Sequence, residues 1–177
     1  MHEVAFNRSV FISSTSRGLN SYREQIVEML RAHDIAAIEQ RSFKPEQEDA
    51  LKLINNAILR ATGVICLVGP YFGVPKDKMN EDMSPRLSYT QWECLLAMRL
   101  GLKPLIYVLE DAFFEDQGGI QDEAELYPEL PDSLYFRKWQ NDFRKHLAID
   151  CGRGSIKTPS ELWRRLAMIN WEKWPTK

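Results

Sequence analysis

The sequence predicts an α/β fold in which helices cover both faces of a central parallel sheet. Short, almost wholly apolar runs alternate along the chain with longer segments whose apolar residues recur every three or four positions. The short runs lack the strict apolar-polar alternation of a half-exposed sheet, which favours a parallel sheet buried on both sides. With 177 residues, 44% of them hydrophobic and 27% charged, the chain has the size and composition of one globular domain, taken as residues 1–177.

Strand and helix patterns follow one another through the first two thirds of the chain. The predicted strands are 9–13, 35–39, 63–69 and 104–109, and the predicted helices between them are 22–33, 45–60 and 88–101. The second helix places Leu51, Ile54 and Ile58 on its inward face. Such a chain fits a flavodoxin-like three-layer sandwich with the strand order 2-1-3-4-5.

The last third of the chain is less regular. An acidic excursion covers about residues 110–132, and nine acidic but no basic residues lie between Lys103 and Arg137. A helix is predicted over 132–146, a short fifth strand over 147–150, and a terminal helix after the capping sequence Thr158-Pro159-Ser160-Glu161. The acidic excursion and the basic segment after it form either a solvated surface or two patches that pair within or between chains.

Composition and motifs exclude several classes of function. We expect no membrane span, no signal peptide and no metal site, and we expect the chain to be cytoplasmic with its three cysteines reduced. No Gly-rich phosphate loop and no nucleophile elbow is present. With a net charge of −2, nucleic-acid binding is not expected.

The carboxyl edge of the predicted sheet gathers polar residues. In this fold, ligands bind at that edge where the strand order reverses, between the loops after the first and third strands. The first loop contains Ser13, Ser14 and Arg17, and the third contains Tyr71. The second strand contributes Glu39, followed by Arg41 and Phe43. The alternative for the hydroxyl cluster is ordinary turn and helix-cap chemistry.

Glu93 is the strongest candidate for a functional residue. Ser88 and Gln91 form a capping box, so Glu93 lies in the second turn of its helix, near the binding edge. It falls within the apolar stripe that includes Tyr89 and Trp92. A carboxylate there is costly to desolvate unless it is paired or used. The alternative is that Glu93 borders the stripe and is stabilised by the helix start.

The ordered motifs resemble those of the Toll/interleukin receptor (TIR) family. They are Val10-Phe11-Ile12-Ser13-Ser14, Ile38-Glu39, Gly63-Val64-Ile65-Cys66-Leu67-Val68, Ser88-x3-Trp92-Glu93-x3-Ala97 and Gly101-x-Lys103-Pro104. The chain is most similar to TIR-like domains at the amino terminus of large NTPase and repeat-containing proteins of defence and immune signalling. Ser14-Thr15 departs from the commoner TIR pattern, which has an aromatic and charged residues there.

The resemblance implies an NAD⁺ glycohydrolase, a hydrolase that cleaves the bond between nicotinamide and ribose with NAD⁺ as substrate and no separate cofactor. It implies that Glu93 is the catalytic residue. The resemblance and the expected ligand site at the carboxyl edge of the sheet together imply a set of substrate-binding residues. These are Ser13, Ser14, Arg17, Glu39, Arg41, Phe43, Tyr71, Tyr89 and Trp92. It also implies activation by self-association through TIR-TIR contacts and fusion to a sensor or NTPase/repeat region in the full-length protein.

Two other functions remain open. The chain could be a non-enzymatic TIR-type interaction module, in which case substitutions over 44–49 or in the acidic excursion matter while Glu93→Ala is neutral or stabilising. The less favoured alternative is a nucleoside deoxyribosyltransferase-like enzyme, which also uses a glutamate on a related fold and would ignore NAD⁺.

Overall fold

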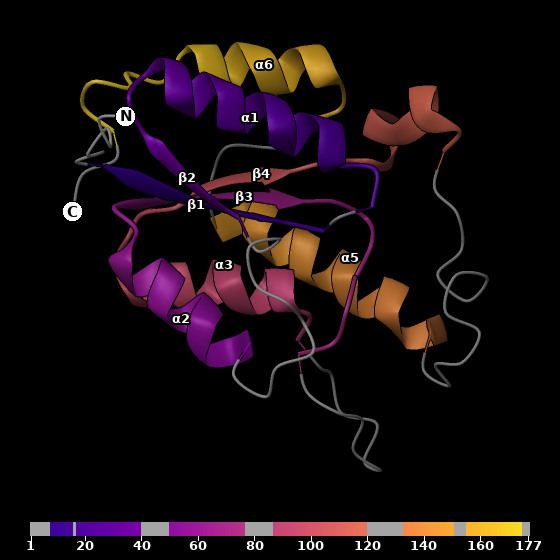
Figure 1. Ribbon diagram of the computed structural model, residues 1–177. Coiled ribbons are helices and arrows are strands. Elements are labelled where there is room, and N and C mark those ends of the chain that lie inside the picture. Colours follow the sequence, from indigo (N-terminus) through magenta and orange to yellow (C-terminus); the bar gives the residue numbers. More distant parts are fainter. Residues whose placement is uncertain are drawn as a thin grey trace.

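Four parallel strands and the helices around them make up the described part of the chain (Figure 1). The computed structural model describes residues 8–15, 17–39, 50–76, 87–119, 133–150 and 155–174. The strands are β1 (Ser9–Ser14), β2 (Ala36–Glu39), β3 (Gly63–Val68) and β4 (Leu105–Val108). The helices are α1 (Asn20–Ala32), α2 (Ala50–Arg60), α3 (Tyr89–Arg99), α5 (Ser133–Asp150) and α6 (Pro159–Ala167), with a 3-10 helix η2 (Asp111–Gln117).

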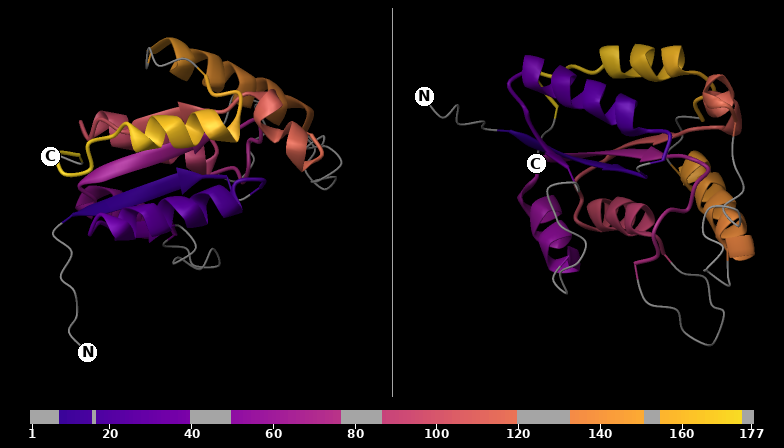
Figure 2. Two further views of the ribbon diagram at one scale, coloured as in Figure 1. Left: turned by 90° about the horizontal axis from the view of Figure 1, so that it is seen from above. Right: turned by 45° about the vertical axis from the view of Figure 1, so that its right-hand side comes forward.

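The sheet has the order β2-β1-β3-β4, and every pairing is parallel. Helices α1 and α6 cover one face, and α2, α3 and α5 cover the other (Figures 1 and 2). The molecule is therefore a flavodoxin-like sandwich, as predicted. This order places β1 and β3 side by side at the centre, so the loops that follow them meet at one edge of the sheet.

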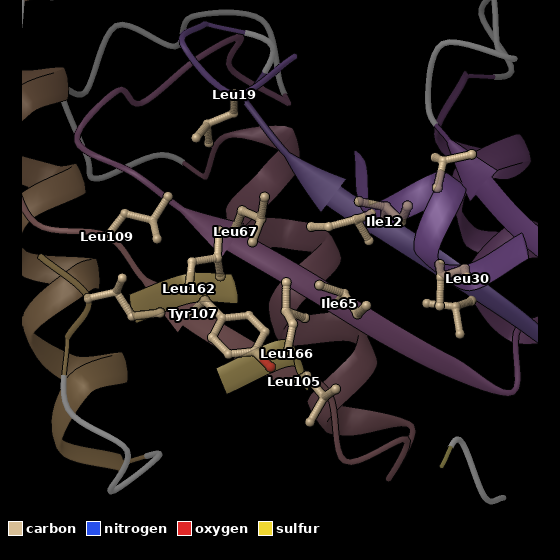
Figure 3. Packing of buried hydrophobic residues seen from close by; sticks show 14 of the residues in the cluster. Ile12, Leu19, Leu30, Ile65, Leu67, Leu105, Tyr107, Leu109, Leu162 and Leu166 are labelled. Atoms are coloured by element: carbon tan, nitrogen blue, oxygen red, sulfur yellow. The ribbon is translucent and has the colours of Figure 1, made fainter. Parts of the chain in front are cut away.

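Two apolar clusters, one on each face, hold the layers together. The side chains of β1 alternate between them: Ile12 packs toward α1 and α6, whereas Phe11 packs toward α2 and α3. Figure 3 shows the first cluster, in which Leu162 and Leu166 of α6 lie against side chains of the sheet such as Tyr107. This alternation directs Ser13, two residues after Phe11, toward α3.

The predicted fifth strand at 147–150 is wrong, because these residues are the last turn of α5. Phe136, Phe143 and Leu147 continue the helical spacing of the buried side of α5, and Leu147 is buried against the second cluster. Ile156 instead forms a single parallel bridge with Leu109 beside β4. Its N–H donates to the Val108 carbonyl at 2.7 Å. Among the described residues, this single bridge is what pairs with the chain beside β4 where the fifth strand was expected.

The helix starts agree with the predictions. Ser88 and Gln91 form the capping box of α3, and Thr158 accepts a hydrogen bond from the Glu161 N–H at the start of α6. The predicted helix at 45–60 is helical over 50–60, and its first part lies outside the described residues, as does most of the acidic excursion. No helix in the described ranges is long and apolar enough to cross a membrane.

Candidate functional site

The carboxyl group of Glu93 is completely buried at the carboxyl edge of the sheet, with an exposed fraction of 0%. The Ser13 hydroxyl donates a hydrogen bond to Glu93 Oε2, with 2.5 Å between the oxygens. The other oxygen, Oε1, has no hydrogen-bond partner among the described residues. A buried carboxyl oxygen without a partner is rare in folded proteins, which makes Glu93 a candidate functional residue.

Burial decides the charge of Glu93. Desolvation raises the pKa of the Glu93 carboxyl from 4.5 to about 8, and the Ser13 hydrogen bond and the positive charge of Arg23 offset only part of this effect. At pH 7 the Glu93 carboxyl is therefore mostly uncharged in the ligand-free protein. A cation placed beside it would favour the ionised form.

Two further hydroxyl groups lie buried at the end of β1. Ser14 and Thr15 are only 4% and 6% exposed, and neither hydroxyl has a hydrogen-bond partner among the described residues. Gly73, with φ +78°, lies close to this segment, since a Cβ atom on it would be 3.2 Å from Thr15 Cγ2. The loops after β1 and β3 are therefore in contact, and the Ser14 and Thr15 hydroxyls lie buried at this edge of the sheet.

Arg17 and Tyr71, both predicted at the site, lie together across the two loops. The Arg17 guanidinium lies 5.2 Å from the centroid of the Tyr71 ring, and Tyr71 packs edge-on against Phe114 of η2. A cation over an aromatic face is attracted by the ring. This pair places a positive group in the loop after β1, at the carboxyl edge of the sheet.

Trp92 and Tyr89 are directed toward α2 and the second apolar cluster. Trp92 Nε1 donates to Asn55 Oδ1 at 3.2 Å, and Lys76 Nζ lies 4.9 Å from the Trp92 ring centroid. Tyr89 is half-buried against the second cluster. Trp92 therefore connects α3 with α2 and with the segment after β3, whereas Glu93 contacts Ser13 of β1.

Glu39 is bound to a residue that the sequence interpretation did not single out. Its Oε1 lies 3.1 Å from Arg23 Nε, and Arg23 is buried in α1. Arg41 and Phe43 lie outside the described residues. Arg23 could have been found from the sequence, because it lies three residues before Ile26 on the buried stripe of α1, as Glu93 lies on that of α3.

A buried amide network fixes the helix that carries Glu93. Gln140 of α5 donates through Nε2 to the Gly69 carbonyl at 2.6 Å, and Gln91 Nε2 donates to Gln140 Oε1 at 2.8 Å. Gln91 is also part of the capping box with Ser88. The network thus links the end of β3, the first turn of α3 and α5.

Other parts of the described structure are poorer candidates for the site. Within the described ranges, no three His, Cys, Asp or Glu side chains are grouped so that they could hold a metal ion. A shallow groove between α1 and α6, with Met29 and Trp163 among its lining residues, lies on the opposite face of the sheet from α3. It contains none of the buried polar groups around Glu93.

The fold and the site define a flavodoxin-like α/β protein with a buried glutamate, Glu93, at the carboxyl edge of its parallel sheet. Residues 9–148 match the family model described as Domain of unknown function (DUF4062), and the chain belongs to this family. No curated protein matches the sequence significantly. One similar solved structure is a 2-desoxiribosyltransferase from Leishmania mexicana, with 13% sequence identity and a TM-score of 0.42 over 72% of this chain and 76% of that chain. A likeness this distant carries no argument about activity.

Proposed function

We propose that this chain is an NAD⁺ glycohydrolase domain that cleaves the bond between nicotinamide and ribose. The observation that carries the proposal is the burial of Glu93 at the strand edge, with one oxygen held by Ser13 and the other without a partner among the described residues. The resemblance of the sequence motifs to the TIR family supports it, because enzymes of that family need a glutamate at the position of Glu93.

One carboxyl group is sufficient for this reaction. When the bond between ribose C1′ and the pyridinium nitrogen breaks, its electron pair neutralises the nitrogen, so nicotinamide leaves without a general acid. The oxocarbenium ion at C1′ is stabilised by the Glu93 carboxylate and captured by water, which loses a proton and yields ADP-ribose. The positive charge of the bound pyridinium also favours ionised Glu93, whose pKa of about 8 otherwise keeps it neutral.

The neighbouring groups suit the rest of the substrate. Ser14 and Thr15 have buried hydroxyls that can bind ribose hydroxyl groups. Arg17 supplies a positive charge for the pyrophosphate. Arg41 and Phe43 remain predicted contacts outside the described residues, and NAD⁺ acts as substrate rather than as a retained cofactor.

We further propose that the domain works in the cytoplasm as an effector that is activated by self-association. The TIR resemblance supports this assignment, along with fusion to a sensor or NTPase/repeat region in a longer signalling or defence protein. Clustering can act on Glu93 because the carboxyl is closed to solvent, so the side chains covering it must move before a substrate can reach it.

Nicotinamide release from NAD⁺ by the artificially clustered chain tests the proposal. We expect wild type and Glu115→Gln, which removes an exposed acid, to release nicotinamide, and Glu93→Gln to lose at least a hundredfold in rate while staying folded. An inactive wild type under strong clustering would favour the interaction module. Transfer of deoxyribose between free bases without NAD⁺ cleavage would favour the deoxyribosyltransferase-like enzyme.

A further inference from the structure

The hydroxyl group of Ser13 is bonded inside the protein. The Ser13 side chain is 0% exposed, and it points from β1 toward the layer of α2 and α3, as Phe11 does two residues earlier. In the parallel pairing of β1 with β3, Ser13 lies opposite Cys66, which belongs to the same apolar cluster as Phe11. A hydroxyl in such surroundings is costly to bury unless it is bonded, and its bond to Glu93 Oε2, with 2.5 Å between the oxygens, supplies the partner.

Both ends of this hydrogen bond are held by regular elements. Ser13 is part of the pairing between β1 and β3, and Glu93 lies in the second turn of α3, whose start is fixed by the capping box of Ser88 and Gln91. The last torsion of a glutamate side chain has only a broad preference of its own, so a free carboxyl group can rotate. The bond from Ser13 removes this freedom, because it turns Oε2 toward β1 and leaves Oε1 as the oxygen without a partner among the described residues.

We propose that Ser13 is a positioning residue of the candidate site, whose hydroxyl holds Glu93 Oε2 so that Oε1 is the oxygen presented to the reacting sugar. A hydroxyl group has one hydrogen to donate, and Ser13 donates it to Glu93. Ser13 therefore acts through Glu93, in place of the substrate contact that the sequence predicts for it. The identity of the sugar as the ribose of NAD⁺ rests on the proposed function, whereas the orientation of the carboxyl group does not.

The hydrogen bond also stabilises the ionised form of Glu93. Burial raises the pKa of the Glu93 carboxyl to about 8, and the Ser13 bond is the larger of the two effects that lower it, ahead of the charge of Arg23. Helix α3 packs against β1, β3 and α2, and the two strands contain no charged residue. The charged residues of α2 and α3 other than Glu93 are exposed, and they are Lys52, Arg60 and Arg99. The other titratable side chains of α3 and β3 are Tyr89, Cys94 and Cys66. Loss of the Ser13 hydroxyl should therefore raise the pKa of Glu93 further.

Titration of the Glu93 carboxyl in the 177-residue chain tests whether Ser13 holds it. The readout is the side-chain carboxyl ¹³C shift of Glu93, assigned by its absence in Glu93→Gln. Ser13→Ala should raise the pKa of Glu93 above that of wild type, whereas Ser13→Thr, which keeps the hydroxyl, should stay near wild type. The matched control is Ser14→Ala, which removes the next hydroxyl of β1 and should leave this pKa unchanged, because the Ser14 hydroxyl makes no hydrogen bond to Glu93. An unchanged pKa in Ser13→Ala, or the same rise in Ser14→Ala, overturns the inference.

Nicotinamide release by the clustered chain distinguishes a positioning residue from a substrate contact. Ser13→Ala should lower kcat at least about tenfold even where its pH profile has levelled off, with KM near that of wild type, because the carboxylate is misplaced rather than absent. The pH at which kcat/KM reaches half its maximum should also rise, and Ser13→Thr should restore both values.

Two other results would contradict this role. A lost substrate contact would raise KM and leave both kcat and the pH of half-maximal kcat/KM unchanged. A hydrogen bond that only joins α3 to β1 would lower the free energy of unfolding without changing the kinetics of the folded chain. If the titration shows the expected shift while clustered wild type releases no nicotinamide, the proposed function fails and the hold of Ser13 on Glu93 stands.

Discussion

Three buried polar side chains occupy helix positions where the spacing of neighbouring residues predicts apolar ones. They are Arg23 in α1, Glu93 in α3 and Gln140 in α5. Each contacts a group at the end of a strand: Arg23 pairs with Glu39, Glu93 accepts from Ser13, and Gln140 donates to Gly69. Polar residues are costly at such positions unless they are bonded, so these interruptions of the apolar stripes single out the carboxyl edge of the sheet as the candidate site.

Glu93→Gln should change how stability depends on pH. In the unfolded chain Glu93 loses its proton near pH 4.5, but in the folded chain only near pH 8. Between these values the folded state binds more protons, so wild-type stability falls as pH rises, by roughly 1.4 kcal/mol per pH unit at most from this group. Urea unfolding at pH 5, 6.5 and 8 measures this. The free energy of unfolding of Glu93→Gln, relative to that of wild type, should increase by a few kcal/mol between pH 5 and pH 8.

The matched control for this measurement is Glu115→Gln, which removes a negative charge from an exposed side chain of η2. A Glu93→Gln variant whose stability relative to wild type is the same at all three pH values would contradict the buried, protonated state of the carboxyl.

The position of Glu93 could be predicted because two local signals coincide, the capping box at Ser88 and the interrupted stripe. Its neighbours could not be predicted in the same way. That Glu39 lies opposite Ile12 depends on the register of β2 against β1, and the pairing of Glu39 with Arg23 depends on how α1 lies over the sheet. Such contacts between segments far apart in sequence follow from packing, which periodicity does not encode.

The contact between the loops after β1 and β3 depends on Gly73. Its φ of +78° favours glycine, and a Cβ atom would lie 3.2 Å from Thr15 Cγ2. Gly73→Ala should therefore lower the free energy of unfolding both through backbone strain, about 1 kcal/mol, and through displacement of Thr15. Gly119, with the same φ of +78° but no atom within 4 Å of its Cβ position, provides the control.

Chemical denaturation of the two variants compares them directly. We expect Gly73→Ala to lower the free energy of unfolding more than Gly119→Ala does. The difference between the two losses measures the cost of displacing Thr15. Equal losses would show that only the backbone conformation matters and that Thr15 moves freely.

The amide network between α3 and α5 should behave as a unit. Gln140→Met leaves both the Gln91 side-chain N–H and the Gly69 carbonyl without their partner, which costs about 1–3 kcal/mol for each buried group. The double variant Gln91→Met/Gln140→Met also removes the Gln91 amide, which the single variant Gln140→Met leaves buried without its partner. A double-mutant cycle by urea unfolding should therefore give a total loss smaller than the sum of the single losses. Strict additivity would refute the coupling.

The sequence predicts elements well where a local motif defines them and less well where only tertiary contacts do. The capping motifs at Ser88 and Thr158 predict the starts of α3 and α6, and the structure confirms both. The predicted strand over 147–150 is wrong because the helical spacing continues through Leu147 and keeps this segment in α5. The single bridge at Ile156 has no sequence signal, because one residue cannot show a period.

The last described residues of the chain are bound to the start of the sheet. Arg8 donates to backbone carbonyls of the C-terminal segment, among them that of Trp171, and the Trp171 ring stacks on His33 with 5.7 Å between centroids. Trp171→Ala should cost about 3–5 kcal/mol of unfolding free energy because it leaves a cavity in the first cluster. Met168→Ala, at an 80% exposed side chain, should have almost no effect. Thermal unfolding measures both, and similar small losses would show that the segment is not part of the cooperative unit.

The dependence of nicotinamide release on pH tests most directly whether the buried Glu93 carboxyl carries the chemistry at the sheet edge. For the clustered wild-type chain, kcat/KM, which reports the free enzyme, should rise with pH, reach half its maximum near pH 8, where Glu93 is half ionised, and level off about one pH unit higher. Glu93→Gln should remove both the activity and this dependence. A rate that is independent of pH from 5 to 9, or a profile unchanged in Glu93→Gln, would contradict the account.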